Sequence, residues 1–207
     1  MEKFVIDTNF FINLEIKSGF GKNAKEVVCS FTAIAMSLKQ DKKAEFFMPP
    51  RIVEEFLGFF DNEDFIKDFL KVITIKSPAR LDLQFNADVF YTLVDEIRER
   101  SYRGLRIAEE AVNHAGRIMT GKINIDKMTF EKTIGESVKI LREKYRQATR
   151  FNFLDSIADL DLIVLAKEQD GFLISSDEGV LRWGRKFGIK EVMPHLFKER
   201  LISLRGG

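Results

Sequence analysis

The chain has 207 residues, of which 45% are apolar and 31% are charged, with a formal net charge of +1. This composition excludes a disordered chain and is typical of one domain, or one domain with an insertion. The only cysteine, Cys29, excludes an internal disulfide, and its apolar helical surroundings predict a buried thiol. No apolar run reaches the roughly 18 residues of a membrane-spanning helix. We therefore expect no membrane association. MEKFVIDTN enters a strand pattern at once, so we expect no signal peptide. The single cysteine fits a reducing compartment and predicts a cytoplasmic location.

The first 85 residues predict alternating strands and helices. Short apolar or β-branched runs predict strands at 3–7, 45–48 and 72–75. A helix is expected over about 23–39, and Pro49-Pro50 opens another helix.

Residues 86–149 show only helical periodicity, with an apolar stripe at Ile134, Val138, Leu141 and Tyr145. Gly104 and the segment GKINID (121–126) predict breaks between two or three helices. The strand-and-helix pattern then resumes, with helices at 160–169 and 178–186, strands at 172–175 and 191–193, and a last helix from Pro194. We therefore expect an α/β fold with a central parallel sheet of about five strands, formed by residues 1–85 and 151–207 and interrupted by a helical arm at 86–150.

Charge is divided between the two parts. From Arg98 to Arg150 there are thirteen Lys and Arg residues against seven Asp and Glu, a balance of +6, so the remainder carries about −5. A basic middle segment indicates an anionic partner, and an acidic remainder indicates a cation.

Carboxylates cluster beside the predicted strands. Asp7 ends the first strand, Asp177 follows the fourth, and the others open nearby helices: Glu54, Glu55, Asp155, Asp159 and Asp161. Because the carboxyl ends of parallel strands meet at one edge of a sheet, we expect these side chains to gather there. Each alone is explained by helix capping or a solvated surface.

Together the carboxylates indicate a bound cation. A pair about 4 Å apart repels by roughly 4 kcal/mol at an effective dielectric constant of about 20. Oxygen ligands select Mg²⁺ or Mn²⁺, and no Cys or His lies in these stretches to favour zinc. Such a metal suits phosphoryl chemistry. His114 and His195 lie in other elements, which disfavours a nuclease that uses a histidine pair.

One competing interpretation is a phosphatase of the haloacid-dehalogenase type. Asp7 followed by Thr8 is similar to the nucleophile of that family, but Asn9 stands where its second Asp is expected.

The motifs VIDTN, DLDLIVLA and ISSDEG, with a Glu early in a helix, resemble a PIN domain in their order and spacing. This resemblance implies a Mg²⁺- or Mn²⁺-dependent ribonuclease with a three-layer α/β/α fold. The strings KAEFFMPP, VITIKSPARLDLQF, RGLRIAEEA, LREKYRQA, LDSIADLDLIVLA and SSDEGVLRWGRKFGIK resemble more narrowly the HARP family of RNA-free ribonucleases P, over nearly the whole chain. The segment 116–135 is longer than in the most compact members.

The narrower resemblance implies an endonuclease that removes the 5′ leader of precursor tRNA, and homodimers that assemble into larger homo-oligomers. Carried over by motif, the catalytic residues are Asp7, Glu55, Asp155, Asp159, Asp161 and Asp177, with Glu54 adjacent to Glu55. Direct metal ligation is assigned to Asp7, Asp161 and Asp177, while Asp155 and Asp159 hold a second metal or orient water.

A basic stripe on the arm predicts RNA binding. Lys139, Arg142, Arg146 and Arg150 share one helical face, and other arm helices add Arg98, Arg103, Arg106 and Arg117. A solvated face paired with Glu109, Glu110 and Glu143 is the simpler interpretation of the stripe alone. Because the chain also has a predicted acidic metal site, contact with RNA phosphates becomes the better interpretation of the basic stripe. Two other functions stay open: another PIN-type endoribonuclease (a toxin or an rRNA- or mRNA-processing enzyme), and a non-catalytic RNA-binding partner of an RNA ligase.

Overall fold

The computed structural model describes residues 1–15, 18–60, 64–81, 83–120, 126–150, 154 and 156–206. The chain divides into two compact units. The first contains Met1–Asn86 and Leu154–Gly207, and the second contains Ala87–Phe153. We predicted a division into 1–85 with 151–207, and an arm at 86–150.

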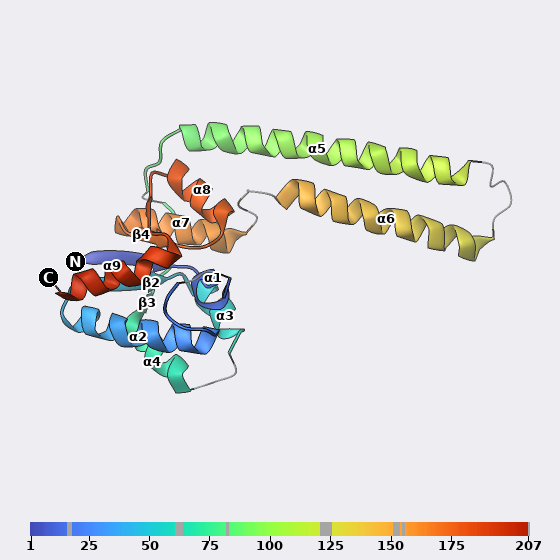
Figure 1. Cartoon of the computed structure of the whole chain (residues 1–207). Coiled ribbons are helices and arrows are strands. Elements are labelled where there is room, and N and C mark those ends of the chain that lie inside the picture. The colour runs from blue at the N-terminus through green and yellow to red at the C-terminus, as the bar shows by residue number, and fades with distance from the viewer. Residues whose placement is uncertain are drawn as a thin grey trace. The chain divides into compact units, whose positions relative to one another are not determined.

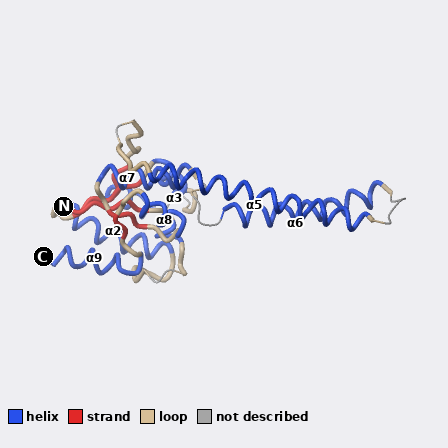
Figure 2. The backbone as a smooth tube through the Cα atoms, turned by 90° about the horizontal axis from the view of Figure 1, so that it is seen from above, coloured by secondary structure: helices blue, strands red, loops and turns tan. Residues whose placement is uncertain are grey.

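The first unit is built on a five-stranded parallel sheet. Its strands are β1 (Glu2–Ile6), β2 (Ala44–Met48), β3 (Ile73–Ile75), β4 (Phe172–Ile174) and β5 (Lys190–Glu191), in the order β3-β2-β1-β4-β5. The strands are red in Figure 2. The order reverses between β1 and β4, where Val5 pairs with Leu173. In open parallel sheets the crevice at such a reversal is where ligands bind.

Helices cover both faces of this sheet, which gives the predicted three layers (Figure 1). On one face lie α2 (Ala24–Gln40), α4 (Asp64–Val72) and α9 (Pro194–Gly206), and on the other lie α7 (Ile157–Gln169) and α8 (Glu178–Lys186). The short α1 (Asn9–Ile12) follows β1, and α3 (Pro50–Leu57) contacts α7.

Phenylalanines fill the α2 side of the core. Phe4 and Phe46 lie on neighbouring strands with ring centroids 5.7 Å apart, Phe31 of α2 meets Phe46 edge-on, and Phe197 of α9 meets Phe4. On the other side, all of Leu162–Ala166 is buried, because α7 is enclosed around its apolar run. Burial on all sides fits a helix without a polar stripe.

Some details of the first unit differ from the sequence predictions. The helices α1 and α4 were not predicted, although α4 buries Ile66, Phe69 and Val72 at helical spacing. The thiol of Cys29 is exposed, not buried, because Cys29 lies two residues from both Val27 and Phe31 and so points away from their face.

The second unit is a pair of long helices, α5 (Asp88–Met119) and α6 (Lys127–Arg150), which lie side by side (Figures 1 and 2). We predicted a helix break at Gly104, and this was wrong: Gly104 lies buried inside α5. A Cβ atom at Gly104 would lie 2.7 Å from Cε2 of Tyr145 on α6, so the glycine permits close approach of the two helices. The predicted break at 121–126 falls between α5 and α6, and 121–125 lie outside the described residues. Within the described chain, no helix has both the length and the apolar character needed to cross a membrane.

Candidate active site

Asp7 is placed by the end of β1, beside β4, at the reversal of strand order. Its backbone N–H donates to the carbonyl of Ile174 at 2.9 Å, which extends the strand pairing by one residue. Its side chain is buried, with 3% of the residue exposed. Ser175 Oγ donates to Asp7 Oδ2 at 2.6 Å, and the amide of Asn9 donates to the same oxygen at 3.3 Å.

Burial desolvates the Asp7 carboxylate. Burial, the largest cause, and the nearby Glu55 carboxylate together raise its pKa from 3.8 to about 6, although the hydrogen bonds from Ser175 and Asn9 lower it. Its described hydrogen-bond partners are neutral groups. A carboxylate in such surroundings favours either a proton or a bound cation.

Glu55 and Asp159 extend this repulsion from α3 to α7. Burial and the charge of Asp159 raise the pKa of Glu55. Asp159 lies in the first turn of α7, where its N–H donates to the Ser156 side chain at 3.0 Å. Asp7, Glu55 and Asp159 therefore form a connected series of acids from three elements. Of the two adjacent glutamates, Glu55 is the one whose charge acts on Asp7.

Asp161 lies among arginines. Its buried carboxylate accepts a hydrogen bond from Arg80 at 3.1 Å, and Arg51 Nη1 lies 3.6 Å from its other oxygen. Asp159 and Asp161 are two residues apart on a helix and so do not share a face. The structure thus separates Asp161 from the repelling acids that lie near Asp159.

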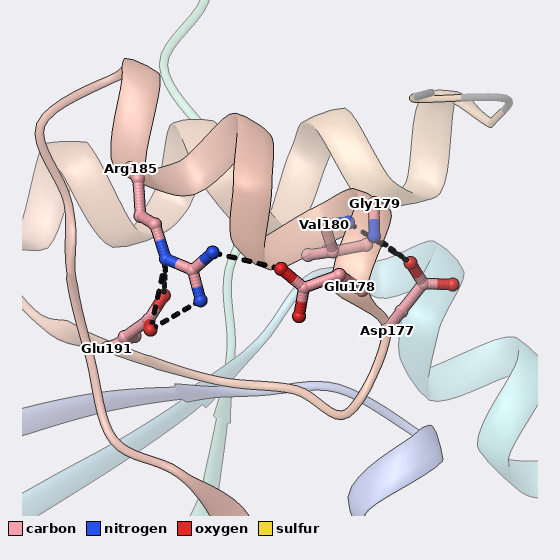
Figure 3. A network of polar contacts seen from close by, with 6 residues as sticks. All are labelled: Asp177, Glu178, Gly179, Val180, Arg185 and Glu191. Atoms are coloured by element: carbon pink, nitrogen blue, oxygen red, sulfur yellow. Dashed lines mark hydrogen bonds and ion pairs between the residues drawn. The ribbon is translucent and has the colours of Figure 1, made fainter. Parts of the chain in front are cut away.

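Asp177 caps the N-terminus of α8 (Figure 3). Its Oδ1 accepts from the N–H groups of Gly179 and Val180 at 2.7 and 3.1 Å. Its own N–H donates at 3.0 Å to Ser175 Oγ, the hydroxyl that donates to Asp7. Ser175 therefore links the ends of β1 and β4.

Farther along α8, one arginine joins the helix to β5. The Arg185 guanidinium donates hydrogen bonds to the carboxylates of Glu178 and Glu191, and these contacts raise its pKa (Figure 3). They fix the helix that Asp177 begins.

The arm carries the basic residues that we predicted to bind RNA. All of those with a described side chain are exposed: Arg98, Arg103, Arg106, Arg117, Lys139, Arg142 and Arg146. Arg103 pairs with Glu99 within α5. Glu110 pairs with Lys144, which does not belong to the basic stripe. The side chain of Arg150, and all of Asp155 in the first unit, lie outside the described residues.

Comparison with known proteins identifies the family. A family model described as a PINc domain ribonuclease matches residues 3–204. The RNA-free ribonuclease P of Thermodesulfovibrio yellowstonii is 38% identical over 204 residues, which cover 99% of this chain and 95% of the relative. The RNA-free ribonucleases P of Pyrococcus horikoshii and Nitrosococcus oceani are 39% and 36% identical over 204 residues, covering 93% and 96% of those proteins. The chain belongs to the RNA-free ribonuclease P family.

A divalent metal fits this member of the RNA-free ribonuclease P family by charge. Among the described residues, no three carboxylate, imidazole or thiol groups stand ready as a metal site. The charge of Glu55 nevertheless raises the pKa of Asp7, and the charge of Asp159 raises the pKa of Glu55, so this group of acids favours a bound cation. Their oxygens are the donors that Mg²⁺ and Mn²⁺ prefer. Asp161 differs, because its carboxylate is already neutralised by two arginines.

Sequence reasoning missed three residues beside these acids, namely Ser175, Arg51 and Arg80. Ser175 stands in the quoted motif ISSDEG, and its place two residues before Asp177 was the available signal. The two arginines follow the ends of β2 and β3, at the edge of the sheet where the acids were expected.

Proposed function

We propose that this chain is a metal-dependent endoribonuclease of the cytoplasm that removes the 5′ leader from precursor tRNA without an RNA subunit. The observation that carries the proposal is the buried Asp7 carboxylate, coupled to Glu55 and Asp159 at the reversal of strand order. Support also comes from full-length similarity to proteins named RNA-free ribonuclease P.

Asp7, Glu55 and Asp159 would hold the Mg²⁺ or Mn²⁺ ion. When bound, such an ion lowers the pKa of water and stabilises negative charge on phosphate oxygens. Ser175 orients Asp7 through its 2.6 Å hydrogen bond. Asp155, Asp161 and Asp177 stay proposed participants: Asp177 has one oxygen left free of its capping bonds (Figure 3), and Asp161 would reach a metal only by exchanging Arg51 and Arg80.

The arm would bind the body of the tRNA through its backbone. The exposed cations Arg106, Arg117, Lys139, Arg142 and Arg146 have no carboxylate partner within 4 Å in the described part of the chain. Arginine contacts to phosphates position an RNA by its shape and not by its sequence, which suits an enzyme with many tRNA substrates.

We also propose that the arm joins copies of the chain into dimers that assemble further. An apolar stripe runs along α5 at Phe90, Val94, Ile97, Leu105 and Val112, and each of these residues is at least half exposed. Their spacing places them on one face of the helix. A contiguous apolar face of this kind is typical of a protein interface.

The proposed function is tested by incubating the protein with a precursor tRNA and Mg²⁺, beside the variant Asp7→Asn. We expect a single cut at the mature 5′ end, a 5′ phosphate on the tRNA, and no cut by the variant. Scattered cuts would favour another endoribonuclease of the PIN type. Binding without any cut would favour an RNA-binding partner of an RNA ligase.

A further inference from the structure

Two arginines share one buried carboxylate beside the proposed active site. The Asp161 side chain is 8% exposed, whereas those of Arg51 and Arg80 are 48% and 63% exposed. One arginine is enough to neutralise one aspartate. The two arginines together therefore carry one positive charge more than the carboxylate they share, and both side chains stay partly exposed.

Arg51 is positioned by α3. Pro50 begins this helix, and Thr8 Oγ1 donates to the carbonyl of Ile52 at 3.1 Å, which ties the start of α3 to the segment after Asp7. Arg51 and Glu55 are four residues apart and so share one face of the helix. Arg51 therefore lies next to the acids proposed to hold the metal.

Arg80 is positioned by the segment that follows β3. Glu168 of α7 accepts from the N–H of Ala79 at 2.7 Å and pairs with Lys76 at 2.6 Å. These contacts fasten the segment along α7, so that Arg80 reaches Asp161 two turns before Glu168. The guanidinium is held before any ligand arrives, which reduces the entropy lost on binding.

We propose that Arg51 and Arg80 form a phosphate-binding pair, held by Asp161, that contacts the RNA backbone at the junction of the 5′ leader and the tRNA. This proposal rests on the proposed function. The planar guanidinium presents paired N–H donors that match two phosphate oxygens, and it does not lose its charge near neutral pH. The pair would attract an anionic strand to a cluster of acids that otherwise repels it.

The test measures RNA binding without cleavage. In EDTA, a precursor tRNA is titrated with the wild type, Arg51→Ala, Arg80→Ala and the double variant. We expect each single variant to bind about three- to tenfold more weakly, and the salt dependence of log K to fall by about 0.7 to 0.9 per lost phosphate contact. Arg205→Ala is the matched control, because Arg205 is an exposed arginine of the same unit, on α9. Its carbonyl accepts a hydrogen bond from Lys43, just before β2, and so lies at the amino ends of the strands and not at the carboxyl ends. Losses equal to those of Arg205→Ala would overturn the proposal.

The position of the contact is tested with a second RNA whose phosphates at the leader junction are neutral methylphosphonates. The double variant should then bind no more weakly than the wild type. An unchanged loss on this RNA would overturn the assigned position. Thermal melting of each variant checks folding, and Arg80→Gln and Arg51→Gln keep the test open if an alanine variant unfolds. All of these binding measurements are made without metal, so they do not depend on cleavage. If the wild type failed to cleave precursor tRNA in Mg²⁺, that result would count against the proposed function, and the binding measurements would still test the arginine pair.

Discussion

At the scale of single residues, the site depends on how Asp7 is surrounded. Its carboxylate is held by a serine hydroxyl and asparagine N–H groups, and the charge of Glu55 raises its pKa. Its pKa of about 6 lies above the ordinary 3.8, so the folded chain keeps a proton on Asp7 that the unfolded chain releases at lower pH. The free energy of unfolding therefore falls as pH rises from about 4 to about 6.

Asp7→Asn should remove this pH dependence. Without metal, the free energy of unfolding of the variant should rise by up to about 3 kcal/mol relative to that of the wild type as the pH goes from 4 to 7. This follows because one pKa unit corresponds to about 1.4 kcal/mol. Chemical denaturation at a series of pH values measures the difference. Added Mg²⁺ should stabilise the wild type above pH 6 and leave the variant unchanged. A constant difference across this pH range would contradict the prediction.

Ser175→Ala should weaken the site without removing an acid. The lost hydrogen bond is one that lowers the pKa of Asp7, so that pKa should rise. We expect cleavage at neutral pH to fall about tenfold, as when a group that orients a metal ligand is removed. The pH profile of cleavage should shift upward, and Ser175→Thr, which keeps the hydroxyl, should restore it. An unmoved profile in the alanine variant would show that Ser175 has only a structural role.

The site residues that could be predicted from the sequence are those whose position depends on their own strand or helix. Asp7 and Asp177 come directly after short apolar strands, so their meeting at one edge of a parallel sheet could be inferred from spacing. The pairing of Asp161 with Arg51 and Arg80 could not, because it depends on how three separate segments pack. Asp155 lies outside the described residues, and its role stays a prediction.

At the scale of elements, most strands and helices follow from apolar periodicity and proline. The predicted helix at 178–186 coincides with α8, and Pro194 begins α9 as expected. The error at Gly104 has a physical cause. Glycine is a poor helix former in isolation, but here the absent side chain makes room for the Tyr145 ring. Long-range packing therefore outweighed local propensity.

Gly104→Ala should loosen the pairing of α5 and α6, because the new methyl group displaces the Tyr145 ring. Gly116→Ala is the matched control, since nothing lies within 4 Å of a Cβ atom at Gly116. We expect the control to stabilise its helix by up to about 1 kcal/mol, and Gly104→Ala to give none of this gain or to destabilise the arm. Amide hydrogen exchange along α5 and α6 measures both. Equal protection in the two variants would contradict the prediction.

At the scale of the whole molecule, the residues proposed to bind RNA lie in the second unit, and those proposed to hold the metal lie in the first. Arg142→Ala with Arg146→Ala should weaken binding of precursor tRNA about tenfold or more and reduce the salt dependence by about one unit per contact. Lys144→Ala is the control on the same helix, because Lys144 already pairs with Glu110. Fluorescence anisotropy at several salt concentrations measures these affinities. A double variant that behaves like the control would remove α6 from the RNA interface.

Assembly can be tested on the apolar stripe of α5. Leu105→Glu with Val112→Glu should place two charges in the proposed interface between copies and lower the sedimenting mass toward that of the 23.9 kDa chain. Glu109→Gln, on the same helix, should leave the mass unchanged. A wild type that sediments as a single chain would contradict the proposed homo-oligomer.

The central pairing of the sheet joins residues from opposite ends of the chain. Phe4 is in register with Phe172, so β1 gains its second neighbour only after the whole arm has been synthesised. Such distant pairings form late in folding. The acids of the first 60 residues can therefore meet Asp159 and Asp177 only after the arm and the segment that follows it have been synthesised.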